Sequence, residues 1–92
     1  MVFAKLPKTV EHAIKILVCL TSFAGRPMSA AGVARRVRIS PAQASKILNY
    51  LNLRGLTRSQ RGSRGGYELR VSPEEISVES VVKLFEPAPE EE

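Results

Sequence analysis

The sequence predicts a mainly α-helical fold with one small β-hairpin. Three observations support this prediction. Apolar residues recur with helical spacing up to about residue 53, serines stand where helix N-caps are needed, and a glycine-rich polar segment separates two short strand-like runs after residue 55. The chain has 92 residues, which suits a single domain with a shallow core. We assign residues 1–86 to this domain and expect the acidic residues 87–92 to form a disordered tail.

A first helix is expected from about Thr9, its N-cap, to Phe23. Apolar residues with the spacing of a buried helical stripe are Val10, Ala13, Ile14, Leu17 and Val18. Further apolar residues widen this stripe beyond the need of one small core. We therefore expect a dimer contact at Ile16, Leu20 and Phe23.

The second helix and the last helix are expected to be shorter. The second covers Ala30–Val37 with Ser29 as N-cap, and a turn at Arg38 and Ile39 follows it. A short turn from Ser72 to Ile76 leads to the last helix, which we expect from about Val78 to Phe85. The residues predicted to pack this helix onto the core are Val78, Val81, Val82 and Phe85.

The third helix begins with a capping box, in which Ser40 is the N-cap and Gln43 occupies position N3. Pro41 stands at the first helical position, and Gly55 provides a left-handed stop. Its predicted buried face consists of Ala44, Ile47, Leu48 and Leu51. The opposite face consists of small or polar residues, Ala42, Ser45, Lys46 and Asn49. Such a face suits a helix that lies in a DNA major groove.

Two strands, Leu56 to Gln60 and Tyr67 to Arg70, are joined by a loop of arginine, serine and glycine. Glycines at positions 62, 65 and 66 allow the positive φ angles of a hairpin tip. Arg61 and Arg64 lie on that tip, and the hairpin has almost no apolar surface to add to a core. It is therefore expected to contact something negatively charged. Together with the helix–turn–helix pattern, it predicts a winged helix bound to DNA.

The distribution of charge favours a nucleic-acid partner. The net charge is +5, but nine arginines and Lys46 lie between residues 26 and 70, where Glu68 is the single acid. Such a positive block indicates a nucleic-acid surface. The alternative is a solvated face with no partner.

Other classes of function find little support. No carboxylate pair or Ser/His/Asp set is present, and the glycine-rich segment lies between strands, which is the wrong context for dinucleotide binding. We therefore expect no enzymatic activity, no metal and no cofactor. Cys19 is expected to be a small buried hydrophobe, with redox sensing as the alternative, and His12 a surface residue rather than a ligand or pH switch. The single cysteine and the absence of an apolar segment long enough to span a bilayer predict a cytoplasmic, nucleoid-associated protein.

Several short motifs resemble those of one family. They are Pro27 to Ala31, Ile39-Ser40, Leu48-x-x-Leu51, Arg54-Gly55-Leu56, Arg61-Gly62 and Gly65-Gly66-Tyr67-x-Leu69. In this order they resemble the Rrf-two family of bacterial winged-helix transcriptional regulators, which includes IscR, NsrR and CymR. The resemblance covers about Thr9 to Glu86.

The resemblance implies a homodimer, or a hetero-partner in its place, on a palindromic double-stranded DNA operator, with repression as the usual outcome. It implies that Ser40, Ala42 and Ser45 face the major groove and that Arg61 reaches the minor groove. Several members sense iron–sulfur clusters through three cysteines beyond the last helix. This chain looks like a short form without that segment and without the dimerisation helix. Arg38 stands where the family usually has glycine.

These arguments predict a sequence-specific DNA-binding transcriptional repressor, with a recognition helix at about residues 40–54 and an arginine-rich wing at residues 61–66. The alternative is a winged-helix module that binds a protein partner. The expected DNA contacts are Ser29, Arg38, Ser40, Ala42, Gln43, Ser45, Lys46, Asn49, Arg58, Arg61, Gly62, Arg64, Gly65 and Gly66.

Overall fold

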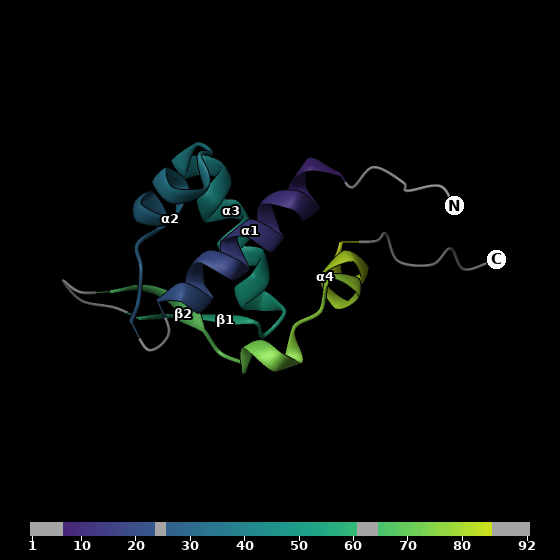
Figure 1. Cartoon of the computed structure of the whole chain (residues 1–92). Coiled ribbons are helices and arrows are strands. Elements are labelled where there is room, and N and C mark those ends of the chain that lie inside the picture. The colour runs from purple at the N-terminus through teal and green to yellow at the C-terminus, as the bar shows by residue number, and fades with distance from the viewer. Residues whose placement is uncertain (1–6, 24–25, 61–64, 86–92) are drawn as a thin grey trace.

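The computed structural model describes residues 7–23, 26–60 and 65–85. Within these ranges the order of elements is α1 (Lys8–Ser22), α2 (Ala30–Val37), α3 (Pro41–Leu53), β1 (Thr57–Gln60), β2 (Gly66–Leu69), the 3-10 helix η1 (Pro73–Glu75) and α4 (Val78–Leu84). Figure 1 shows the hairpin on one side of the crossing helices and α4 on the other. Helices α1, α2 and α3 pack together, and the hairpin lies against α1 and α3. The predicted fold class is confirmed.

The core is apolar and comes mainly from the first three helices. Its buried residues are Val10, Ala13, Ile16, Leu17, Leu20, Met28, Val33, Ala34, Ala44, Ile47, Leu48, Leu51 and Val81. Helix α3 buries the four residues that its periodicity predicts. This match fixes which face of α3 is left for solvent.

Helix α1 differs from its prediction at both its start and its buried stripe. It begins at Lys8 after Pro7, and no side chain caps it, so Thr9 is not the N-cap. Ile16 and Leu20 are almost fully buried, whereas 61% of Val18 is exposed. The buried residues Val10, Ala13, Ile16, Leu17 and Leu20 form one stripe, which is rotated away from Val18 because this side of α1 packs against α2, α3, α4 and β2. The dimer contact predicted at Ile16 and Leu20 is therefore wrong, since both side chains belong to the protomer's own core.

Serine caps fix the positions of α2 and α3. Ser29 Oγ accepts a hydrogen bond from the Gly32 amide at 3.0 Å. At α3, Ser40 Oγ accepts from the Gln43 amide at 3.1 Å, and Gln43 Oε1 accepts from the Ser40 amide at 3.4 Å. The predicted capping box is confirmed.

Two left-handed residues set the ends of α2 and α3. Arg38, which ends α2, has φ 64° and ψ 50°, and Gly55 after α3 has φ 82°. An L-residue such as Arg38 pays roughly 1 kcal/mol for this conformation, which explains why glycine suits the position. The turn geometry implied by the resemblance is thus present with arginine in it.

The hairpin is seated on the loop that precedes α2. Its strands pair antiparallel, and Met28 and Tyr67 form a further bridge, with N···O distances of 2.9 and 2.8 Å. At Gly66, φ is 154° and a Cβ atom would lie 2.6 Å from the carbonyl carbon and oxygen of Met28. Only glycine permits this close approach. The strands begin one residue away from their predicted starts.

Helix α4 closes the described part of the chain. Ser77 and Ser80 form a capping box, Val81 is buried, and Val82 and Phe85 are partly buried against the core. Val78 is 57% exposed, so its predicted packing onto the core is wrong. Val78 is the first residue of α4, and the side of this turn that carries it is open to solvent. The predicted acidic tail at residues 87–92 lies outside the described residues.

Candidate nucleic-acid interface

The outer face of α3 carries five of the predicted DNA contacts. Ala42, Gln43, Lys46 and Asn49 are exposed and Ser45 is half-buried. Because Gln43 Oε1 accepts from the Ser40 backbone, the amide group that Gln43 has free is its NH₂ donor. The helix therefore presents small side chains and hydrogen-bond donors to solvent.

A hydrogen bond joins this face to the hairpin. The Tyr67 hydroxyl, on β2, donates to Asn49 Oδ1 at 2.9 Å. Tyr67 is also partly buried against the core. The contact spans 18 residues of sequence, and no local pattern signals it. It links α3 to the hairpin and leaves the Asn49 NH₂ group as a donor.

Arg58 is paired within the hairpin. Its Nε lies 2.9 Å from Glu68 Oε2, and Gln60 Nε2 donates to the same oxygen at 2.7 Å. These two hydrogen bonds hold the pKa of Glu68 below its usual value, and the bond from Gln60 has the larger effect. The carboxylate is therefore charged at neutral pH and offsets the charge of Arg58, whose side chain is still 63% exposed. The pair with Glu68 thus lowers the net positive charge that Arg58 presents to a partner.

The other predicted contacts surround these elements. Ser29 and Arg38 are exposed at the two ends of α2, and Ser40 is exposed at the start of α3. Gly65 and Gly66 are half-buried at the start of β2, where Gly66 has a packing role against Met28. Arg61, Gly62 and Arg64 lie outside the described residues.

The comparison with known proteins decides the family. A family model described as Rrf2, iron-dependent transcriptional regulator, matches residues 6–91. The chain belongs to the Rrf2 family. Its relatives are transcriptional regulators and not enzymes, which confirms the predicted absence of an enzymatic role at the level of the family.

Other transcriptional regulators resemble the chain in sequence and in structure. YffB of Lactococcus lactis, described as an HTH-type transcriptional regulator, is 32% identical over 83 residues, which cover 89% of this chain and 53% of that protein. A relative from Aquifex aeolicus with the same type of description is 29% identical over 84% of this chain and 54% of its own length. The chain thus spans about half the length of these relatives.

Among solved structures, CymR, the global cysteine regulator of B. subtilis, superposes with a TM-score of 0.85 at 26% identity. This match covers 97% of this chain and 71% of CymR. IscR of T. potens also gives a TM-score of 0.85, at 24% identity, over 97% of this chain and 66% of IscR. The second likeness shows the shared fold.

Cys19 lies on α1, next to the residues before α2. It is half-buried, and its sulfur lies 3.8 Å from the sulfur of Met28. Burial raises the pKa of the Cys19 thiol, an effect that Arg36 partly opposes. The thiol is therefore mainly protonated at neutral pH, the form that is the weaker nucleophile. Within residues 7–23, 26–60 and 65–85, no three His, Cys, Asp or Glu residues gather in a group that could hold a metal ion.

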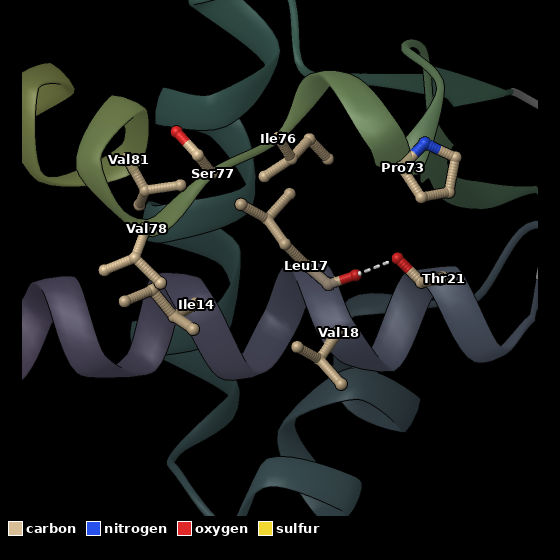
Figure 2. Close-up of a pocket in the computed structure, with 9 residues that line it drawn as sticks. All are labelled: Ile14, Leu17, Val18, Thr21, Pro73, Ile76, Ser77, Val78 and Val81. Atoms are coloured by element: carbon tan, nitrogen blue, oxygen red, sulfur yellow. Dashed lines mark hydrogen bonds between the residues drawn. The ribbon is translucent and has the colours of Figure 1, made fainter.

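An apolar groove of about 170 Å³ lies on a different surface, between α1, η1 and α4. Figure 2 shows Leu17 of α1 pointing toward Ile76 and Ile14 of α1 lying beside Val78 of α4. The groove shares no residue with the predicted DNA contacts. Phe23, the third predicted dimer residue, lies elsewhere and is partly covered by the Arg36 guanidinium, 4.5 Å from its ring centroid. No helix of the described residues has the length and hydropathy that a membrane crossing requires.

Proposed function

We propose that the chain binds duplex DNA sequence-specifically and represses transcription, with α3 in the major groove and the hairpin at the adjacent backbone and minor groove. The observation that carries this proposal is the hydrogen bond from Tyr67 to Asn49. Because it joins the hairpin to the outer face of α3, the two elements form one surface. Winged helices that read DNA need such a fixed relation between a groove-reading helix and a basic hairpin.

The side chains of this surface divide into two roles. Gln43 and Asn49 have free NH₂ donors, which match acceptors on base edges such as N7 and O6 of guanine, and Ala42 suits the methyl group of thymine. Ser45 lies between them on the same face and contributes to the choice of sequence. Lys46 and the arginines, including Arg61 and Arg64 of the wing, neutralise phosphates and contact the minor groove.

A second copy of the chain completes the site on a palindromic operator. One winged helix covers one half-site, so a dimer reads two. The apolar groove of α1 and α4 supports this, because Val18 and Val78 are large apolar residues left exposed. Val18→Asp should keep the fold and lower both self-association and operator affinity. A monomer that binds a full operator as tightly as the parent would contradict the dimer.

The same groove favours the second candidate, a winged-helix module that binds a protein partner. In that case α1 and α4 would hold the partner, and the positive block would be a solvated face. The two functions differ in their dependence on salt, since phosphate contacts release counterions when they form.

The test is duplex binding across salt concentrations, on operators identified by genomic footprinting and on scrambled duplexes. DNA binding predicts that log K falls linearly with log salt, by about 0.9 for each phosphate contact, and that the operator binds more tightly at every point. Tyr67→Phe should narrow the gap between operator and scrambled duplex and leave the salt slope unchanged. Absence of duplex binding at low salt would favour the protein-interaction module.

A further inference from the structure

A hollow of about 480 Å³ lies where the start of α1, the outer side of α3 and the end of α4 meet. Its size falls within the range of small-molecule sites. Three residues of its wall, Gln43, Lys46 and Asn49, also belong to the proposed DNA surface. Its other walls come from Lys8 and His12 on α1 and from Phe85 after α4, so it joins the DNA surface to the end of the chain's last helix.

The apolar part of the hollow is held in place before any ligand arrives. The rings of Tyr50 and Phe85 have centroids 4.8 Å apart and an interplanar angle of 48°. The Tyr50 hydroxyl donates to the Leu84 carbonyl and accepts from Arg54 Nε at 3.2 Å, so this ring is fixed at both sides. Leu53 is 82% exposed and therefore contributes little to the core. These residues form a prepared apolar surface, which lowers the cost of ordering on binding.

The polar part consists chiefly of hydrogen-bond donors. Gln43 Oε1 and Asn49 Oδ1 are both engaged in hydrogen bonds, which leaves the two NH₂ groups. Lys8 and Lys46 add ammonium groups. Lys8 has Glu11 at 3.7 Å, whereas Lys46 has no ion pair among the described residues. The hollow is therefore suited to a ligand that brings acceptors and negative charge.

We propose that this hollow binds a small organic anion with an aromatic ring, its ring against Tyr50, Leu53 and Phe85 and its carboxylate near Lys46. Such a ligand covers the part of α3 that faces DNA, so the ligand and the operator compete. The competition rests on the proposed function, whereas binding in the hollow does not.

The test uses salicylate and, as a matched neutral probe, 2-hydroxybenzyl alcohol, which keeps the ring and lacks the carboxylate. In a titration followed by backbone-amide NMR, salicylate should change the amide chemical shifts of Lys46, Tyr50 and Leu53 until the site is saturated. The amide chemical shifts of Val18 and Val78 should not change. Lys46→Gln should raise the Kd of salicylate about threefold, as expected for the loss of one exposed charge pair. The Kd of 2-hydroxybenzyl alcohol should not change. Lys15→Gln removes an exposed lysine of α1 outside this hollow and is the matched control.

The outcomes separate this proposal from the function. Equal binding of the two probes, or salicylate shifts confined to the groove of Val18 and Val78, would overturn it. A second result would also overturn it. Salicylate would change no amide chemical shift, and replacing the glutamates at 86 and 90–92 by glutamine would change the amide shifts of the hollow. The chain's own acids would then be the occupant. Salicylate binding in the hollow without any effect on operator affinity would support the site and count against the proposed DNA surface.

Discussion

Helices α1 and α3 are the two longest helices of the described chain, but they divide their surfaces differently. Helix α1 contacts α2, α3, α4 and β2, and ten of its fifteen residues are buried or half-buried. Helix α3 contacts α1, α2 and β1 and keeps Ala42, Gln43, Lys46 and Asn49 of its outer face exposed. A helix covered on several sides determines stability, whereas a helix with a free face is available for recognition. Substitutions of buried residues in α1 should therefore affect folding, and substitutions on the outer face of α3 should affect binding.

The largest effect is expected at Ile16, which is fully buried in α1. Ile16→Ala removes buried methylene and methyl groups and leaves a cavity, so it should lower the free energy of unfolding by about 2–5 kcal/mol. Val18→Ala, two residues away and largely exposed, should change it by less than about 0.5 kcal/mol. Urea denaturation of both variants measures the difference. Equal stability of the two variants would show that the buried face assigned to α1 is wrong.

A smaller loss of stability is expected at Gly66, which connects the hairpin to the loop before α2. Gly66→Ala would place a Cβ atom 2.6 Å from backbone atoms of Met28 at a positive φ, and this strain should cost about 1–3 kcal/mol. The matched control is Gly32→Ala, whose Cβ meets the flexible Met28 side chain at 3.2 Å inside a helix. It should change stability by less than about 1 kcal/mol. Thermal unfolding that ranks the two variants in the opposite order would contradict the observed seat of the hairpin.

On α3, Lys46→Gln should leave stability unchanged and weaken duplex binding. Loss of one phosphate contact should reduce the salt slope by about one unit, for operator and scrambled duplex alike. Lys15→Gln on α1 removes the same charge from another surface and should keep the parent slope. If both variants reduce the slope equally, binding depends on net charge and not on the face of α3.

The smallest effect concerns the pH dependence of the hairpin. The pKa of Glu68 is lowered in the folded state, so the carboxylate contributes stability above its unfolded pKa, near 4.3. That contribution disappears as pH falls through the lower folded pKa. Glu68→Gln should therefore be less stable than the parent at pH 7, and the difference should shrink below about pH 4. A difference that stays constant down to pH 2 would show that the charge of Glu68 is not responsible.

The sequence predicts the buried face of α3 better than that of α1. All four predicted core residues of α3 are buried. On α1 the predicted stripe is confirmed at Val10, Ala13 and Leu17 but is wrong at Val18, and it leaves out the buried Ile16 and Leu20. Apolar residues lie on both sides of the α1 stripe, so periodicity alone does not indicate which side α2, α3, α4 and β2 cover. Local rules predicted the caps at Ser29 and Ser40, since caps depend on adjacent residues.

Long-range pairs within the candidate site are the part that sequence patterns missed. Arg58 lies directly opposite Glu68 in the hairpin, so working out the strand register would have indicated their ion pair. The bond from Tyr67 to Asn49 has no such signal, because it depends on how the hairpin sits against α3.

The most direct test of this division between α1 and α3 is to map an operator duplex onto the folded chain by backbone-amide NMR. The account predicts that shifts concentrate at residues 42–49 on α3 and at Gly65 and Gly66 of the hairpin. The amide signals of the groove residues Val18 and Val78 should have the same chemical shifts as in DNA-free protein of the same oligomeric state. Shifts confined to that groove, with the outer face of α3 unchanged, would contradict the account.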